Sequence, residues 1–451
     1  MVERCPEKAG VACSIHALGT ILLRSKPFGF ELCRNWSCEA IPEFFKLIGE
    51  ADHFFTPRPM QDKIIRLRKG KLGRLWPGHP WIFRRQILKL TSNVQPGDIV
   101  TVISNEDKFV GRGYFNPASE IAIRLLTFKD EPVNEAFLAR RINDAIEKRA
   151  YLKDLTNARR LIFSEADGLP GLIADLYGNT LVFQVFTLGM DNMKGLVLKL
   201  IKEAVSPEFV YERSDSPFRR IEKLKSIKQW IGPAGNADVE ISEGGAKFIV
   251  GIANGHKTGF YLDQRRSRFG LRDISQGKRV LDLFCYTGGF SINAALGGAG
   301  SVLGVDIKKD WLELARRNAL LNGVSDKIEF QTGDAFKMLE GLNSSGEKFD
   351  IIVVDPPSFL RSKKDLVMAT RGYKERNTLA FKALAEKGVL CTFSCSHNMP
   401  NDIFAGIIKD SAKVAGKTFT ILKRCHQDKD HPIAKEIPET EYLKGYFLNV
   451  A

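Results

Sequence analysis

A thiol and several carboxyl groups follow short apolar runs in the second half of the sequence. Cys395 stands in Ser394-Cys-Ser after residues 388–393, and Asp355 opens Asp-Pro-Pro-Ser-Phe after residues 349–354. A thiolate can add covalently to an electron-poor carbon, and a carboxyl group can exchange a proton or bond a ring nitrogen. If both runs are strands of one parallel sheet, their carboxyl ends meet at the same edge. The two residues therefore predict a catalytic site at that edge.

The stretch from residue 278 to 306 predicts the unit that would carry a cofactor. Residues 280–284 form an apolar run typical of a buried strand, a turn with Gly288 and Gly289 follows, and Asp306 ends a second run. Glycines let the backbone approach a ligand, and an acid at a strand tip can bond ribose hydroxyls. The turn lacks the Gly-x-Gly-x-x-Gly of dinucleotide sites, so we expect another nucleoside cofactor. An ordinary βαβ unit with a glycine turn is the open alternative.

Apolar and helical stretches alternate from there to the C-terminus. We expect strands at 301–305, 328–332, 349–354, 388–393 and 442–449, and helices at 290–296, 310–321, from 335, 365–386 and 402–415. This alternation predicts an α/β fold with a doubly wound, mostly parallel sheet. The chemically useful residues at or just past the expected strand ends are Asp282, Gly288, Asp306, Asp334, Asp355 and Cys395. We therefore expect them to gather at one edge.

Two of these motifs resemble those of methyltransferases. Asp282, followed by Cys-Tyr-Thr-Gly-Gly, resembles the first motif of class I methyltransferases, which bind S-adenosylmethionine. Asp355-Pro-Pro is similar to the motif of enzymes that act on a flat nitrogenous base. Ser358 and then Phe359 follow the prolines, whereas enzymes that methylate amino groups usually carry an aromatic residue directly after them. This difference weakens an amino group as the target.

Cys395 favours a pyrimidine as the target. Carbon 5 of a pyrimidine is a poor nucleophile, and a thiolate that adds to carbon 6 makes it reactive. A free thiol has a pKa of about 8.5, so we expect nearby basic groups to lower the pKa of Cys395. Cys391 lies inside the apolar run and is expected to be inert core. The alternative is that Cys395 is also a buried structural cysteine.

A polar, glycine-punctuated run at residues 255–268 stands just ahead of the cofactor stretch. It holds more hydrogen-bond donors than a connection between domains needs. The candidates to line a cleft are Lys257, Tyr261, Asp263, Gln264 and Arg265. A solvated linker is the alternative.

The N-terminal part of the sequence favours RNA binding. Residues 61–90 hold nine Lys or Arg and one acid, with aromatic residues between them. Strand-like runs follow at 99–103, 109–114 and 121–127. Basic charge and aromatic rings suit phosphates and unstacked bases, and the arrangement resembles the PUA domain, a small RNA-binding β-barrel. The alternative is a barrel with an aromatic core and solvated lysines.

Residues 132–250 predict an α+β middle domain. Helical periodicity at 134–152 and 190–204 and strands at 180–186 and 209–212 support it. Gly168-Leu-Pro-Gly-Leu predicts a structural turn. Arg219 and Arg220 either touch RNA or belong to a solvated loop.

Composition limits the class of protein. The 451 residues include 67 Lys and Arg against 53 Asp and Glu, and the net charge of +14 favours an anionic partner, nucleic acid first, over a generic basic surface. Eight cysteines are too few for a disulfide scaffold, and their spacing predicts no metal site. We expect a cytoplasmic protein without a membrane span. Residues 1–60 predict an extension, either disordered or upstream of a natural start at Met60.

Together these motifs resemble the PUA-containing class I ribosomal RNA methyltransferases, closest to the large-subunit methyltransferase I family. The resemblance covers residues 61–451. It rests on Lys257-Thr-Gly-Phe-Tyr-Leu-Asp-Gln-Arg, Leu281-Asp-Leu-Phe-Cys-Tyr-Thr-Gly-Gly-Phe, Asp355-Pro-Pro-Ser-Phe, Ser394-Cys-Ser and Glu439-Thr-Glu-Tyr-Leu-Lys-Gly. It implies an S-adenosylmethionine-dependent enzyme that forms 5-methylcytosine in 23S ribosomal RNA.

The resemblance also implies roles for single residues. Cys395 would be the covalent nucleophile, and Asp355 would bond the cytosine ring nitrogen. Cofactor contacts would come from Asp282, Phe284, Tyr286, Gly288, Asp306, Ile307, Asp334, Ala335, Asp355 and Tyr261. Substrate contacts would come from Lys257, Gln264, Arg265, Pro356, Pro357, Phe359, Arg74 and Trp81.

We expect four parts: the extension 1–60, a PUA-like barrel 61–131, the middle domain 132–250 and a methyltransferase domain 251–451. Two other functions stay open, namely an RNA guanine methyltransferase with a structural Cys395 and a non-catalytic RNA-binding assembly factor. The sequence does not identify the modified nucleotide, the form of the RNA, or the base that removes the carbon-5 proton. It also leaves the oligomeric state open, with a homodimer as one option.

Overall fold

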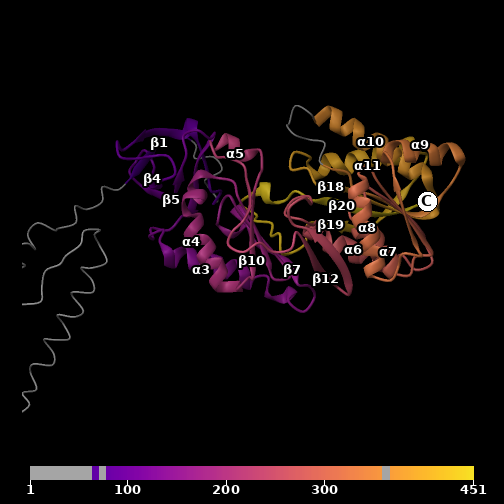
Figure 1. Cartoon of the computed structure of the whole chain (residues 1–451). Helices are drawn as coiled ribbons and strands as arrows, with labels where there is room; N and C mark the ends of the chain where they lie inside the picture. The colour runs from indigo at the N-terminus through magenta and orange to yellow at the C-terminus, as the bar shows by residue number, and fades with distance from the viewer. Residues whose placement is uncertain (1–62, 71–77, 358–365) are drawn as a thin grey trace, which may run out of the picture. The chain divides into compact units, whose positions relative to one another are not determined.

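The computed structural model describes residues 63–70, 78–357 and 366–451 (Figure 1). These residues form sheets of six, five and seven strands and one two-stranded hairpin, β12 (Asp238–Glu243) with β13 (Ala246–Gly251). The α/β class predicted from the sequence is confirmed. The expected extension lies outside the described residues, and the four domain limits stay a prediction.

The seven-stranded sheet has the order β16-β15-β14-β17-β18-β20-β19. Its strands are β14 (Arg279–Leu283), β15 (Ser301–Asp306), β16 (Ile328–Thr332), β17 (Phe349–Val354), β18 (Leu384–Ser394), β19 (Phe419–Cys425) and β20 (Lys444–Val450). β20 runs antiparallel to both of its neighbours, and the other neighbouring strands pair in parallel. The carboxyl ends of β14 to β18 therefore share one edge, as predicted.

Helices cover both faces of this sheet. They are α6 (Arg265–Arg272), α7 (Gly289–Leu296), α8 (Lys309–Leu321), α9 (Ala335–Ser345), α10 (Leu366–Ala383) and α11 (Asn401–Val414). Successive side chains of a strand point to opposite faces, and β17 shows the result. Ile351 and Val353 belong to the core that includes α7 and α8, whereas Ile352 and Val354 belong to the core that includes α10 and α11. A run buried on both faces is why residues 349–354 could be recognised as a central strand.

Two expectations for this sheet are wrong. The helix predicted at 365–386 ends at Ala383, and β18 begins at Leu384, before the expected residue 388. A shift in register against β17 and the positive φ of Lys387 accommodate Glu386 and Lys387 within the strand, although such charges are typical of a helix end. β19 was not expected, because it is an edge strand whose side chains are mostly exposed.

The six-stranded sheet near the N-terminus has the order β2-β6-β5-β4-β1-β3. Its strands are β1 (Ile64–Leu67), β2 (Trp81–Phe83), β3 (Ile87–Leu90), β4 (Ile99–Ile103), β5 (Phe109–Phe115) and β6 (Ile121–Thr127). The last three lie where the alternating pattern places them, within one residue. The first three have only three or four residues each, and the sequence pattern does not reveal them.

The five-stranded sheet has the order β11-β10-β9-β8-β7. It comprises β7 (Ala158–Phe163), β8 (Leu172–Tyr177), β9 (Thr180–Val185), β10 (Phe209–Ser214) and β11 (Ile227–Trp230), with α3 (Glu135–Glu147), α4 (Leu188–Val205) and the single turn α5 (Phe218–Ile221). β7 and β8 escaped prediction because charged residues interrupt their apolar patterns. Arg160 and Asp175 are nevertheless buried and form a two-bond ion pair with distances of 2.8 Å.

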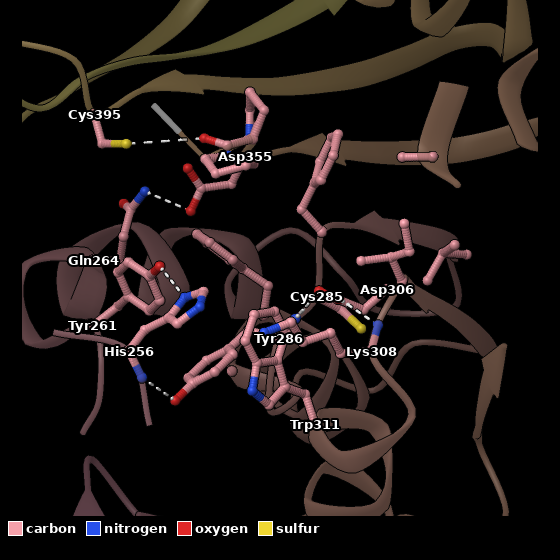
Figure 2. A pocket seen from close by; sticks show the side chains of 18 of the residues that line it. His256, Tyr261, Gln264, Cys285, Tyr286, Asp306, Lys308, Trp311, Asp355 and Cys395 are labelled. Carbon is pink, nitrogen blue, oxygen red and sulfur yellow. Dashed lines mark hydrogen bonds between the residues drawn. The ribbon is translucent and has the colours of Figure 1, made fainter. Parts of the chain in front are cut away.

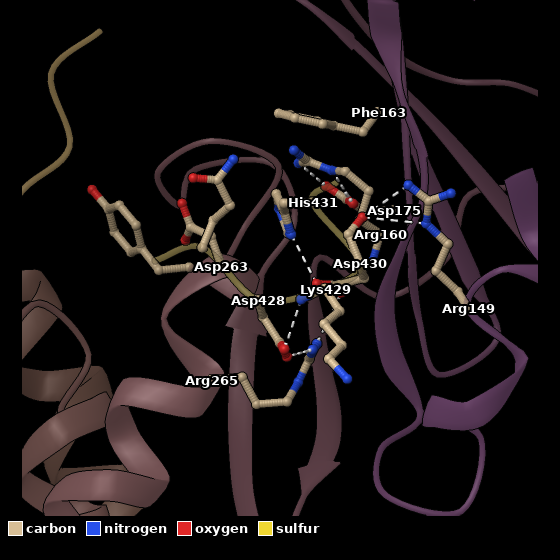
Figure 3. A network of polar contacts seen from close by, with 12 residues as sticks. Arg149, Arg160, Phe163, Asp175, Asp263, Arg265, Asp428, Lys429, Asp430 and His431 are labelled. Carbon is tan, nitrogen blue, oxygen red and sulfur yellow. Dashed lines mark hydrogen bonds and ion pairs between the residues drawn. The ribbon is translucent and has the colours of Figure 1, made fainter. Parts of the chain in front are cut away.

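A buried ionic network connects the middle region to the seven-stranded region (Figure 3). Arg265, the first residue of α6, is fully buried and bonds the carboxylates of Glu243, Asp428 and Asp430. Arg149, just after α3, donates to the backbone oxygen of Asp430 at 3.2 and 3.0 Å. Buried charges need partners, so these residues hold segments far apart in the sequence in one arrangement.

We predict that Asp430→Asn lowers the free energy of unfolding by about 3 kcal/mol or more, because it leaves the buried Arg265 with one carboxylate fewer. Denaturant titration followed by fluorescence and circular dichroism measures the change. Asp410→Asn is the matched control, since Asp410 forms an exposed pair with Lys374 at 3.5 Å and should cost about 0.5 kcal/mol or less. Equal losses in the two variants would contradict a dominant role of the network.

Candidate active site

The carboxyl ends of β14, β15, β17 and β18, together with the run before α6, line one cavity of about 360 Å³ (Figure 2). This volume lies in the range of small-molecule sites. The cavity brings together fourteen residues predicted from the sequence. They are Lys257, Tyr261, Asp263, Gln264, Phe284, Tyr286, Asp306, Ile307, Asp334, Ala335, Asp355, Pro356, Pro357 and Cys395.

Asp306, at the end of β15, is positioned to bind a nucleoside. Its Oδ2 accepts a hydrogen bond from the backbone N–H of Tyr286 at 2.9 Å, and its Oδ1 accepts one from the backbone N–H of Lys308 at 3.2 Å. Each carboxylate oxygen can accept a further bond, and a ribose offers two neighbouring hydroxyls. The residue is almost fully buried, so such bonds would form away from water.

The turn after β14 has a strained backbone. Phe284 and Tyr286 have φ angles of 63° and 52°, in the left-handed region that side chains normally avoid. Strain of this kind costs about 1–2 kcal/mol for each residue and persists where the surroundings enforce it. Here it brings the backbone N–H of Tyr286 onto Asp306 and the ring of Tyr286 into the cavity wall.

Asp334, the N-cap of α9, also lines the cavity. Its Oδ1 accepts bonds from the backbone N–H groups of Phe336 and Lys337 at 2.9 and 3.0 Å, and Oδ2 is left for another donor. Phe284, Ile307 and Ala335 supply apolar surface in the same cavity. An acceptor beside apolar surface suits the amino group and ring of adenine. These residues and Asp306 therefore fit the nucleoside half of S-adenosylmethionine.

An aromatic cluster around His256 forms a further part of the wall, and sequence reasoning missed it. The ring of His256 stacks on Tyr286 with centroids 5.0 Å apart and meets Trp311 edge-on at 4.1 Å. Its Nδ1 lies 2.8 Å from the Tyr261 hydroxyl, and its backbone N–H donates to the Tyr286 hydroxyl at 2.9 Å. Burial, with Lys308 and Arg213, lowers the pKa of His256 to about 4, so the ring is neutral at physiological pH.

The signal for this cluster is weak in the sequence. His256 directly precedes the predicted Lys257, and Trp311 lies in the first turn of the helix after Asp306. Nothing local indicates that residues 55 positions apart pack against each other.

Cys395 and Asp355 lie together at the other end of the cavity (Figure 2). The Cys395 thiol lies 3.9 Å from the backbone oxygen of Pro356, and Asp355 Oδ2 accepts a hydrogen bond from Gln264 Nε2 at 3.0 Å. Burial, with Asp263 close by, raises the pKa of Asp355 from 3.8 to about 7. Burial, with Asp355 close by, raises the pKa of Cys395 to about 12.

The expectation that basic groups lower the pKa of Cys395 is therefore wrong for the structure without substrate. Lys257 acts in the expected direction, but burial and Asp355 outweigh it. Lys257 also forms an ion pair with Asp263, and its ammonium lies 4.5 Å from the ring centre of Tyr261. Burial alone would raise the pKa of Asp263, yet Lys257 brings it well below the usual range.

Two predicted cofactor contacts, Asp282 and Gly288, do not line the cavity. Asp282 Oδ2 accepts bonds from the backbone N–H and hydroxyl of Ser291 at 2.9 and 2.6 Å, and burial raises its pKa to about 7. It thus fixes the start of α7. Gly288 has a φ of 81°, and a Cβ there would lie 3.1 Å from Phe330, so the turn and its packing require the glycine. We reassign both to positioning the cofactor turn.

Two predicted substrate contacts, Arg265 and Trp81, also lie elsewhere. The predicted substrate contact of Arg265 is wrong. Its side chain is fully buried and bonded to three carboxylates, so it cannot reach a substrate. Trp81 lies on β2, where its indole N–H donates to Glu165 at 3.0 Å. Arg74 and Phe359 fall outside the described residues.

No group of three or more His, Cys, Asp or Glu side chains in the described ranges is arranged to hold a metal ion. Among the described helices, none has the length and apolar character needed to cross a membrane.

Known proteins show the same organisation. A family model described as S-adenosylmethionine-dependent methyltransferase matches residues 190–413, and a PUA-like domain model matches residues 65–128. A solved structure described as a SAM-dependent methyltransferase from Streptococcus mutans aligns with a TM-score of 0.73 at 22% identity. The alignment covers 86% of this chain and 100% of the Streptococcus mutans chain. A methyltransferase solved in complex with SAH has a TM-score of 0.74 at 23% identity, with 86% and 99% covered. These structures show the fold.

Curated relatives show the family. The ribosomal RNA large subunit methyltransferase I of an Escherichia coli strain is 40% identical over 389 residues, which cover 85% of this chain and 98% of that protein. The protein of the same name from Salmonella arizonae is 39% identical, with 85% and 96% covered. The chain therefore belongs to the ribosomal RNA large subunit methyltransferase I family, whose fold is that of S-adenosylmethionine-dependent methyltransferases.

Proposed function

We propose that this protein transfers a methyl group from S-adenosylmethionine to carbon 5 of a cytosine in large-subunit ribosomal RNA, through a covalent adduct with Cys395. One observation carries the proposal: the Cys395 thiol, the Asp355 carboxyl group with a pKa near 7 and the Asp306 carboxyl group line the same cavity. The RNA class comes from the names of the relatives, and the net charge of +14 agrees with it.

The first step needs a proton acceptor for the thiol and a proton donor for the base, and Asp355 can be both. As a carboxylate it takes the proton of Cys395 while the Cys395 sulfur forms a bond to carbon 6. The electrons of the carbon 5–carbon 6 double bond move toward ring nitrogen N3, which takes the proton from Asp355. The charge is thus balanced without an external base, and carbon 5 becomes nucleophilic.

When bound, S-adenosylmethionine supplies an electrophilic methyl group on a sulfonium. A new bond from carbon 5 to that methyl forms as the sulfur–methyl bond breaks. Loss of the carbon-5 proton then restores the double bond, and the Cys395 sulfur departs with the electrons of its bond to carbon 6. N3 returns its proton to Asp355, which passes it to the sulfur and so restores the thiol. No described residue is assigned as the acceptor of that proton.

Gln264 explains a preference for cytosine. Its Nε2 donates to Asp355, and its Oε1 is a buried acceptor without a partner among the described residues. Cytosine has an amino group next to N3, whereas uracil has an oxygen there. Gln264 and Asp355 therefore present an acceptor and a donor to neighbouring atoms of one base edge, which the base exposes only after it leaves its stack.

We predict that Cys395→Ala abolishes a covalent complex with RNA that contains 5-fluorocytosine, in which fluorine replaces the carbon-5 hydrogen and cannot leave as a proton. Denaturing gel electrophoresis detects the complex, and mass spectrometry of nucleosides identifies the methylated base. Methyl transfer should fall at least about a thousandfold because the nucleophile is lost. Cys391→Ala is the matched control, since Cys391 is buried inside β18 and should keep the adduct. Methylguanine in the product, with no adduct in the wild type, would refute the mechanism.

We predict that Asp355→Asn reduces methyl transfer by about 10²–10⁴-fold and removes a rise in kcat/KM with pH that levels off near pH 7.

The same substitution that lowers activity should raise the stability of the folded protein at high pH. Protonation of Asp355 stabilises the folded wild type below about pH 4, and this contribution is lost as the pH rises through 7. The variant should therefore be more stable than the wild type at pH 8, by on the order of 1 kcal/mol, and similar at pH 4. Thermal unfolding at the two pH values tests this; an unchanged difference would contradict it.

We predict that Asp306→Ala weakens S-adenosylmethionine binding by about 10–100-fold, because the ribose loses a charged acceptor. Isothermal titration calorimetry measures the affinity. Asp310→Ala, on the exposed first turn of α8, should leave it unchanged. An affinity that survives Asp306→Ala would place the ribose elsewhere.

A further inference from the structure

The segment that follows β10 is held firmly in place by two buried charged residues. Arg219 is 1% exposed, and its guanidinium donates to the backbone oxygens of Lys225 at 2.7 Å and Val185 at 2.6 Å and to Asp191 at 3.1 Å. The segment is therefore a well-anchored part of the surface and not a solvated loop. This separates the Arg219-Arg220 pair, because Arg219 is structural and Arg220 is exposed.

The second anchor joins the segment to the N-terminal sheet. Glu222 is 5% exposed, and its Oε2 accepts a bond from Asn116 Nδ2 at 2.7 Å and from the backbone N–H of Leu188 at 3.2 Å. Asn116 directly follows β5. The segment thus contacts the part of the chain that matches the PUA-like model.

Around these anchors, apolar and basic side chains project into solvent. Phe218 is 68% exposed and Ile221 is 54% exposed. We define the basic–aromatic patch as the exposed or outward residues Phe218, Arg220, Ile221, Lys223, Lys225 and Lys228. None of its four cations is in an ion pair with another described residue. The buried anchors hold Phe218 in an exposed position, where its ring adds nothing to the hydrophobic core. Exposed apolar surface of this kind marks interaction sites.

The patch lies close in sequence to the cavity wall. Arg213, near the end of β10, donates to the backbone oxygens of Ile252, at 3.1 Å, and Gly255. Gly255 directly precedes His256 of the aromatic cluster. Phe218 lies five positions after Arg213, a span of at most about 18 Å. A strand of RNA whose target base enters the cavity can therefore extend to the patch within a few nucleotides.

We propose that the basic–aromatic patch binds a single-stranded segment of the RNA next to the target nucleotide. Phe218 stacks on an unpaired base, and the cations contact the neighbouring phosphates. Four cations without acidic partners fit a polyanion better than an apolar protein surface. A single strand is required because a base inside a duplex does not offer its face. The inference rests on the proposed function in taking RNA as the substrate.

Fluorescence anisotropy with a short labelled single-stranded RNA of mixed sequence tests the proposal on the full chain. Phe218→Ala should weaken binding by about fivefold or more, because one stacked base is lost. Arg220→Gln with Lys223→Gln should reduce the slope of log affinity against log salt concentration by about 1 to 1.5, since each lost phosphate contact contributes about 0.7. S-adenosylmethionine affinity and the thermal midpoint should match the wild type in both variants.

Matched controls lie outside the patch. Tyr151→Ala removes a 50% exposed ring, and Lys409→Gln with Lys413→Gln removes two exposed cations on α11. Both should bind RNA like the wild type. Wild-type affinity and salt slope in both patch variants would overturn the inference and leave a protein as the occupant of the patch. If the patch variants lose affinity while the wild type forms no adduct with 5-fluorocytosine RNA, the cytosine chemistry fails and this inference stands.

Discussion

Arg265 has no contact with water, and the need to neutralise it constrains the whole active-site wall. Its three carboxylate partners come from β12 and from the segment before β20, so the two segments must close around α6 before the charge is paired. A buried guanidinium with a missing partner would cost several kcal/mol, which makes alternative positions of α6 unfavourable. The two residues before it are thereby fixed. Asp263 accepts a bond from the Tyr442 hydroxyl at 2.6 Å, and Gln264 donates to Asp355.

The burial that fixes this wall also sets the protonation states of the site. It raises the pKa of both Asp355 and Cys395, so the thiol keeps its proton until a partner for that proton is present. A thiolate that existed permanently would be open to oxidation, because reactivity toward oxidants follows thiolate character. Under the proposed mechanism the incoming base supplies the missing acceptor at N3. The raised pKa of Cys395 then links formation of the nucleophile to the presence of the base.

The sequence predicted the part of the site that follows from sheet topology. Asp306, Asp334, Asp355 and Cys395 each follow a recognisable strand, and parallel strands present their carboxyl ends at one edge, so their meeting in one cavity could be inferred without coordinates. Arg265 could not be placed in this way. Its partners Asp428 and Asp430 lie more than 160 positions away. The sequence of a donor-rich run does not show whether the donors face a ligand or buried acids. The packing of His256 against Trp311 and the strands that carry Arg160 and Asp175 were hidden for the same reason, since long-range partners decide their burial.

Under the proposed function, the cavity identifies a base but not its position in a long RNA. Gln264 and Asp355 contact at most one base edge, and every cytosine presents the same edge. Selection of one nucleotide must therefore come from contacts at a fixed distance from the cavity. The N-terminal sheet is attached at several places, among them Trp81 and Arg124 to Glu165 at 3.0 and 2.6 Å, and His79 to Glu439 at 3.0 Å. Under the proposed function, RNA held by that sheet reaches the cavity at a set spacing, and the spacing selects the nucleotide.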